Sequence, residues 1–183
     1  MKYPTQLKLK IAIGTALLVA GPQLALAGHA NTVLTAQLDG RHEVANDARD
    51  KRIVGDKNGR GEAYVFGIDG DPTTLCYVLL VEKIQLVPVT EGMAAHIHFG
   101  ERGQNGPVVA ALAGPFDGNA ADCLTEGEPG KFPLDPMAGS GIVQDILNHP
   151  GDYYINVHNP EFPGGAVRGQ LEYVEEEDHD GDL

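Results

Sequence analysis

Short apolar runs, each closed by a cluster of turn-forming residues, decide which folds are open to this chain. The 183 residues include 24 glycines and 12 prolines but no tryptophan, and several apolar runs alternate with polar residues. Alternation with a period of two is typical of strands that bury one face, and glycine-rich clusters such as 55–59 and 163–165 are typical of turns. The sequence therefore predicts an all-β protein, an antiparallel Greek-key-like β-sandwich or barrel.

One short helix is expected in addition to the strands. It lies within Asp135–Asn148, where Ile142, Ile146 and Leu147 follow the helical spacing. The segment 114–132 offers little readable chemistry and is expected to be a long surface excursion. The expected strands are Thr32–Leu38, Gly61–Ile68, Thr74–Val81, Ile84–Val87, Met93–Phe99, Val108–Leu112, Tyr153–His158 and Ala166–Val174.

The first 27 residues are expected to be a signal peptide. Three lysines precede an apolar run at 11–20, and Ala25-Leu26-Ala27 follows as a small-x-small cleavage site. The apolar run is too short to span a bilayer, which disfavours the alternative of an amino-terminal membrane anchor. We expect a periplasmic or secreted protein whose mature chain has no membrane span, with residues 28–174 forming a single domain.

The charge balance points to cations as partners. The formal net charge is −13, and removal of the first 27 residues takes away three lysines and no acid, which gives about −16. Such a chain repels nucleic acid and anionic lipid. Part of the excess lies in residues 175–183, which are expected to be an acidic, disordered and solubilising tail.

The two cysteines, Cys76 and Cys123, both lie in the part of the chain expected to be exported. An even count in an oxidising compartment favours one disulfide, which would close a loop of about fifty residues and tie the 114–132 segment to the strand that carries Cys76. Two free buried thiols are the alternative, because spacing alone does not prove a bridge.

Two histidines alternate within one expected strand. Because side chains of a strand point to opposite faces in turn, His96 and His98 share one face, while Ala95, Ile97 and Phe99 share the apolar one. The Cα atoms of the two histidines would be roughly 6.5–7 Å apart, so both rings can reach one ion. Met93 falls on the apolar side and is expected in the core.

The strand 153–158 repeats this pattern, with Tyr154, Asn156 and His158 on its polar face. If the hairpin that follows has its midpoint near Pro163, His158 lies opposite Arg168 on the next strand. One polar face is then expected to collect the side chains His96, His98, His158, Arg168 and Gln170.

Three neutral imidazoles within such reach suit copper, which stands highest in the affinity order for nitrogen ligands, or zinc. His42, which follows the first strand, is a candidate fourth ligand. Arg168 has two interpretations: a hydrogen-bonding clamp on the loop or on Glu161, or a charge that steers a small anion toward the metal. Three exposed histidines on the wet side of a sheet are the alternative to a metal site.

The motifs resemble those of the CHRD (chordin) domain family. Residues 94–98, Ala-Ala-His-Ile-His, followed by Gly-Gln-Asn-Gly-Pro-Val-Val at 103–109, resemble its central signature. Residues 153–158 and 162–171 resemble its closing signature, and 38–44 its opening; the likeness covers roughly Thr32 to Glu172. The resemblance implies a β-rich extracellular module, found in exported bacterial proteins and in animal chordin, and no settled activity. Prolines usual after the opening are replaced here by Ala45-Asn46-Asp47, and His42 replaces a commonly uncharged residue.

Three functions remain open at this stage. The first is an exported copper-binding protein for storage, delivery or tolerance, with a copper-transfer protein as its partner. The second is a redox enzyme, because a histidine pair on a β-sandwich is similar to the copper-ligand pattern of copper,zinc superoxide dismutase; this is analogy only. The third is a metal-free adhesion or interaction module. No arrangement typical of hydrolases or nucleotide-binding proteins is readable.

Overall fold

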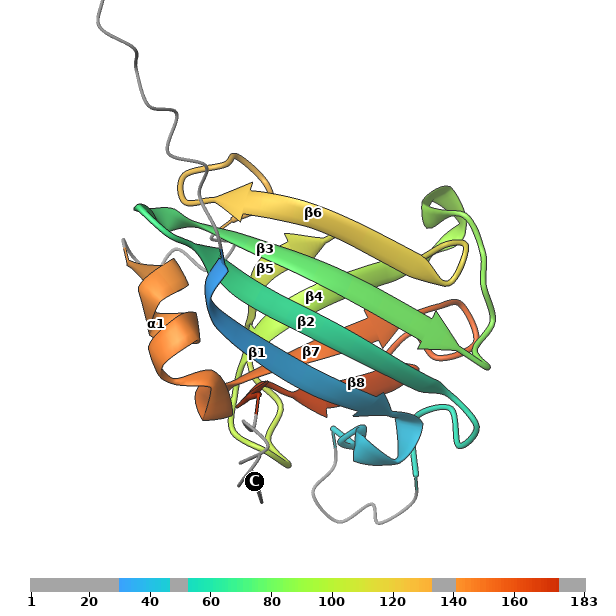
Figure 1. Ribbon diagram of the computed structural model, residues 1–183. Coiled ribbons are helices and arrows are strands. Elements are labelled where there is room, and N and C mark those ends of the chain that lie inside the picture. Colours follow the sequence, from blue (N-terminus) through green and yellow to red (C-terminus); the bar gives the residue numbers. More distant parts are fainter. Residues whose placement is uncertain (1–29, 47–52, 133–140, 175–183) are drawn as a thin grey trace, which may run out of the picture.

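The computed structural model describes residues 30–46, 53–132 and 141–174, and within them the protein is all-β (Figure 1). The strands pair antiparallel in one sheet of nine, in the order β5-β4-β7-β8-β1-β2-β3-β6, with β9 paired to β1 beside this path. The strands are β1 (Ala30–Asp39), β2 (Arg60–Ile68), β3 (Asp71–Glu82), β4 (Ala94–Phe99), β5 (Val108–Leu112), β6 (Asn119–Thr125), β7 (Tyr153–His158), β8 (Val167–Gln170) and β9 (Glu172–Tyr173).

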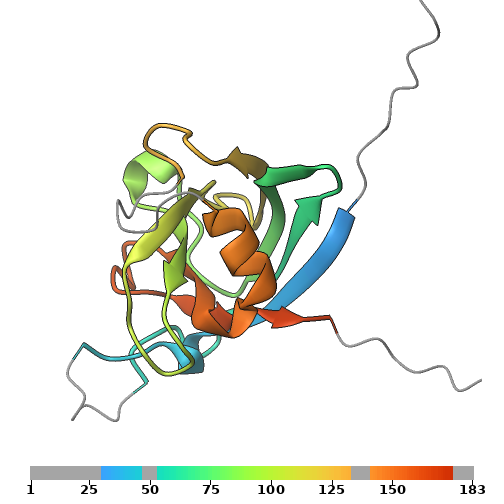
Figure 2. The ribbon, with the colours of Figure 1, turned by 90° about the vertical axis from the view of Figure 1, so that its left-hand side faces the viewer.

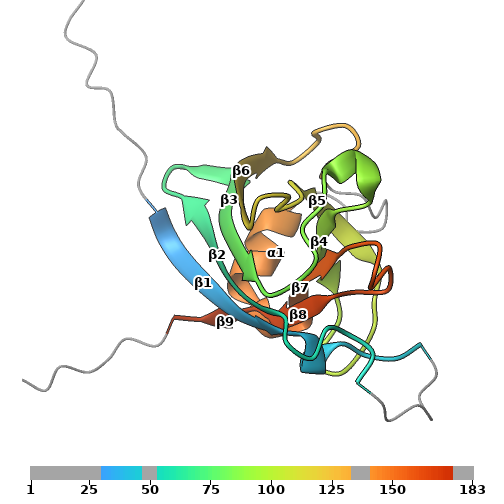
Figure 3. The same ribbon diagram turned by 90° about the vertical axis from the view of Figure 1, so that its right-hand side faces the viewer.

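The sheet rolls up into a nearly closed barrel. Figure 3 shows β1, β2, β3 and β6 on one side and β5, β4, β7 and β8 on the other, with the core between them. Alternate residues of the strands point inward and are buried, as the period-two pattern predicts. The core includes Leu34, Leu38, Val65, Leu75, Leu79, Ile97, Leu124, Ile155, Val157 and Leu171.

One α-helix, α1 (Ile142–Asn148), covers an end of the barrel (Figure 2). It buries Ile142, Val143, Ile146 and Leu147, which follow the helical spacing. The carboxylate of Glu126 accepts hydrogen bonds from the backbone N–H groups of residues 141 and 143 and so satisfies donors at the start of the helix. Within the described residues there are also three short 3-10 helices: η1 (Gly40–His42), η2 (Val89–Glu91) and η3 (Pro150–Asp152).

The structure confirms the expected all-β antiparallel fold with one short helix, and it corrects three expectations. Ile84–Val87 is a loop rather than a strand, because Lys83 has a φ of 59° and turns the chain at the end of β3. The 114–132 segment is not merely an excursion, because it contains β6. The expected strand 166–174 is divided into β8, which pairs with β7 and β1, and β9, which pairs with β1.

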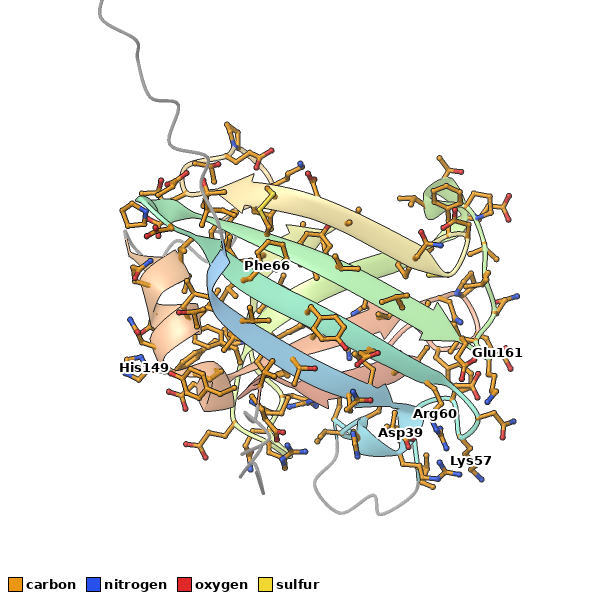
Figure 4. The ribbon with its side chains drawn as sticks, viewed as in Figure 1. Asp39, Lys57, Arg60, Phe66, His149 and Glu161 are labelled. Carbon is orange, nitrogen blue, oxygen red and sulfur yellow. A yellow bond between two sulfur atoms is a disulfide. The ribbon has the colours of Figure 1, made fainter. Side chains whose placement is uncertain are left out.

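Of the other sequence expectations, some are confirmed and some concern residues that the structure does not describe. Met93 is buried, as expected. Cys76 and Cys123 form a disulfide between directly opposed positions of β3 and β6, visible as the yellow bond in Figure 4. The expected signal peptide at 1–27, the tail at 175–183 and residues 135–140 of the expected helical segment lie outside the described residues. Within the described part of the chain, no helix is long and apolar enough to cross a membrane.

Candidate metal centre

The candidate centre lies on the outer face of the half-sheet formed by β4, β7 and β8. Ala95 and Ile97 of β4 are buried in the core, and His96 and His98 point to the opposite face. Phe99, expected on the core side, is 48% exposed at the end of the strand. β4 is therefore set in register by its apolar residues, and this places both imidazoles on the outside.

The third histidine comes from the neighbouring strand. β7 pairs with β4 so that Asn156 lies opposite His96, which makes His158 a diagonal neighbour of His96. The ring centroids are 5.8 Å apart for His96 and His98, 5.2 Å for His96 and His158, and 6.4 Å for His98 and His158. One possible ligand atom from each ring lies within 4.8 Å of the other two, so the three side chains can hold one ion.

Backbone carbonyls fix two of the rings. The Nδ1 of His98 lies 2.9 Å from the carbonyl oxygen of Gly106, and the Nδ1 of His158 lies 3.1 Å from that of Pro163. Because a carbonyl only accepts, both Nδ1 atoms carry the proton and both Nε2 atoms keep a lone pair. Metal-binding histidines are commonly oriented by such a hydrogen bond from the nitrogen that does not bind the ion.

The remaining lone pairs have no hydrogen-bond partner in the described structure. His98 Nε2, His158 Nε2 and His96 Nδ1 are all buried and unpaired. Buried polar atoms are nearly always hydrogen-bonded in folded proteins, because an unpaired one costs about 1–3 kcal/mol. Together these three nitrogens form a donor set. Their lone pairs have no partner in the described protein, and a metal ion would supply one.

The three imidazoles are held in the form that binds metal. Burial lowers the pKa of all three, for His96 to about 4, and the neighbouring imidazoles lower the pKa of His96 and His98 further. A neutral imidazole has a lone pair to donate, whereas an imidazolium does not. The cluster is therefore uncharged near pH 7 and ready to accept a cation without first losing protons.

An aromatic stack connects the histidines to Arg168. The ring of Tyr154 on β7 stacks on His98 at a centroid distance of 4.7 Å, and the Arg168 guanidinium carbon lies 3.3 Å from the centroid of the same ring. Because β4 and β8 flank β7, these contacts come from its two sides. The Tyr154 hydroxyl also accepts a hydrogen bond from the N–H of Gly106, so the loop that fixes His98 is held from two directions.

Arg168 is a clamp on a loop. Its side chain is buried and donates to the carbonyl oxygens of Glu101 and Gln104 and to the amide oxygen of Asn105. From the sequence, a clamp on the 159–165 hairpin loop, a clamp on Glu161 and an anion-steering role were all open for Arg168. Its described hydrogen bonds go to neither the hairpin loop nor Glu161, but to residues 101–105 in the loop between β4 and β5. Gln170 acts in the same way, donating to three further carbonyl oxygens.

The prediction that His158 lies opposite Arg168 across the hairpin is wrong. Arg168 lies opposite Asn156, because the hairpin is centred at residue 162 rather than 163. Moving the midpoint by one residue shifts each partner by two, and a shift of two keeps every side chain on the same face. For this reason Arg168 and Gln170 still lie on the histidine face.

A family model described as the CHRD domain matches residues 34–171, most of the chain. This chain belongs to the CHRD family. No curated protein and no solved structure matches it. In this CHRD domain the matched range includes β4, β7 and β8, and so all three clustered histidines and Arg168.

His42 is not brought into the histidine group of this CHRD domain. It is exposed at the end of η1, and the group of possible ligands in the described residues consists of His96, His98 and His158 alone. The alternation of side chains along a strand does not apply to a residue outside a strand, so the position of His42 could not be derived from it.

Sequence reasoning missed Glu43 as a site residue of the CHRD domain. Both of its carboxylate oxygens lie within 2.9 Å of the amide nitrogen of Asn156, the residue between His96 and Arg168. Burial raises the pKa of Glu43 to about 8, against the opposing effects of Arg168 and Asn156. A Cβ at Gly165 would lie 2.5 Å from this carboxylate, so the glycine leaves it room. The only sequence signal was the position of Glu43 within the family's opening motif.

Proposed function

We propose that this CHRD-domain protein is an exported copper-binding protein, with His96, His98 and His158 as the ligands. The observation that supports the proposal best is the set of three buried ring nitrogens, one from each histidine, that have no partner in the described structure. The protein leaves these lone pairs unpaired at a cost in stability. A bound ion would remove that cost, because each nitrogen would then form a coordination bond.

The composition of the donor set favours copper over other ions. It consists of imidazole nitrogens without a carboxylate or thiolate in the described group, and both cysteines are in the disulfide. Calcium and magnesium prefer oxygen ligands, whereas imidazole suits copper and zinc, with copper bound more tightly at equal geometry. Zinc is the competing ion for this set.

The proposed setting is the periplasm or the extracellular space, and the role is storage, delivery or tolerance of copper. The support is the signal-like sequence of residues 1–27, the disulfide and the strong negative charge, which attracts cations. Delivery would require a copper-transfer protein that docks near the rings.

A second candidate is a copper redox enzyme. The described residues offer three candidate ligands, and catalytic metal sites typically use three protein ligands and keep one position open for water or substrate. A redox assay of the copper-loaded protein, with superoxide as the substrate, separates this function from storage.

The test is metal content of the mature protein beside His96→Ala/His98→Ala. We expect about one copper per chain in the parent and none in the double variant, with copper bound more tightly than zinc. The control is His149→Ala, because His149, labelled in Figure 4, is exposed at the end of α1 and is not one of the clustered histidines, so its loss should leave copper binding unchanged. Equal and low copper in parent and double variant would contradict the proposal and favour the metal-free interaction module.

A further inference from the structure

A pocket of about 420 Å³ lies on the same half of the molecule, apart from the histidine cluster. Its floor is β8, which contributes Arg168 and Gln170. One wall is the segment that begins in η1, and the other is the loop between β4 and β5; both lie beside β8 in Figure 3. The lining residues are Arg41, His42, Glu43, Val44, Arg102, Gly103, Arg168 and Gln170.

The charge of this pocket is opposite to that of the protein. The chain has 26 acidic and 13 basic residues, yet three arginines and one histidine line the pocket with a single carboxyl group. Arg41 and Arg102 have exposed side chains that form ion pairs with Asp39 and Glu172, which lie outside the lining. A local positive potential in an acidic protein attracts small anions and repels cations.

The floor of the pocket contains a buried cation that lacks an ion-pair partner in the described part of the chain. Arg168 is 2% exposed, and its three hydrogen bonds go to two carbonyl oxygens and one amide oxygen. A guanidinium has five N–H donors, so two are left without a described partner. A buried charge is stable when an opposite charge is close, and an anion in the pocket would supply it.

Glu43 does not cancel the positive charge of the pocket. Its two carboxylate oxygens are directed to the Asn156 amide, and burial raises its pKa to about 8, so the group is mostly uncharged at pH 7. As a neutral acid it repels no incoming anion and can itself donate a hydrogen bond.

The geometry points to a second site: we infer that this pocket binds a small oxyanion, of the carboxylate or phosphate class, between the guanidinium groups of Arg41, Arg102 and Arg168. Guanidinium groups bind such anions through paired N–H···O bonds, which are stronger than neutral hydrogen bonds. The inference goes beyond the proposed copper function and does not depend on it.

The experiment is calorimetric titration of the copper-free mature protein with inorganic phosphate and, separately, with malonate. The test variant is Arg41→Gln/Arg102→Gln, because both side chains are exposed, at 48% and 61%, and their loss should not unfold the protein. The matched control is Lys83→Gln/Lys131→Gln, which removes the same charge from exposed positions outside the pocket lining.

We expect at least one of the two anions to bind the parent, and to bind the arginine variant about tenfold or more weakly. The lysine variant should bind like the parent, and the anion that binds identifies the class. The inference is overturned if neither anion binds the parent, or if the two variants weaken binding equally, which would indicate attraction by general surface charge.

Discussion

The outer faces of the two halves of the barrel are built from similar polar residues but differ in what lies over them. On β1 and β2, Gln37, Glu62 and Tyr64 interact with one another and remain open to water. On β7 and β8, Asn156 and Gln170 are buried beneath loops. The same residue type is therefore a solvent residue on one face and an obligatory hydrogen-bonding group on the other.

The difference shows what a covered polar face requires. The buried amide and guanidinium groups on β7 and β8 donate to acceptors brought by loops from elsewhere in the sequence. Among the described residues, the buried side-chain atoms left unpaired are one nitrogen of each clustered histidine and Oδ1 of Asn156. A buried polar group without a partner costs stability, so unpaired atoms concentrate where a ligand can satisfy them. On the covered face, most of the described unpaired atoms therefore lie in the histidine cluster, where an ion could satisfy them.

The largest expected difference in stability between the two faces is that between replacing Arg168 and replacing Arg60. Arg168→Met should lower the free energy of unfolding by about 3–5 kcal/mol, because it leaves the carbonyls of Glu101 and Gln104 without their donor under the loop. Arg60→Met, at the edge of the open face in Figure 4, should cost less than about 1 kcal/mol. Urea denaturation measures both. Equal losses would contradict the contrast.

The next contrast depends on pH. Burial raises the pKa of folded Glu43 to about 8, so its contribution to stability is present below about pH 4.5 and is lost as the pH rises through 8. Glu43→Gln does not titrate and should gain roughly 2–4 kcal/mol relative to the parent between pH 5 and pH 9. Thermal and urea unfolding at several pH values measure the gain. A difference that stays constant with pH would show that Glu43 ionises normally.

A matched pair of glutamines tests the covering loops directly. Gln170→Leu should cost about 2 kcal/mol, because Nε2 of Gln170 donates to the carbonyls of Gly100, Gly151 and Tyr153. Gln37→Leu on the open face should change stability by no more than about 0.5 kcal/mol. Chemical denaturation of both variants suffices. The comparison fails if Gln37→Leu is the more damaging change.

The smallest expected effect on stability is at the site itself. His96→Leu removes a buried nitrogen that has no partner, so the metal-free protein should be as stable as the parent or about 1 kcal/mol more stable. The same variant should lose copper binding. A large loss of stability in the metal-free protein would assign His96 a structural role instead. Denaturation and metal analysis of one sample decide between these roles.

Much of the fold and the grouping of three histidines on one face could be predicted from the sequence. Alternation placed His96, His98 and His158 on the outer face because the period of a strand assigns faces without knowledge of the register. It failed for β6, whose one buried side chain is Leu124, since an edge strand with so little buried surface has no clear pattern.

The loop residues of the site were beyond this reasoning. Glu43 and Asn105 reach Asn156 and Arg168 across more than sixty positions of sequence, and turns carry no period from which such contacts follow. The register error at Arg168 had a similar origin, because the hairpin midpoint depends on loop geometry that composition does not specify.

The disulfide has a consequence for the association of one molecule with another. In the described sheet β6 is an end strand, and Cys123 attaches it to its neighbour β3. A margin strand that detaches uncovers a row of unpaired amides, the template from which chains associate into aggregates. By limiting how far β6 can separate from β3, the Cys76–Cys123 bond protects the solubility of the protein as much as its stability.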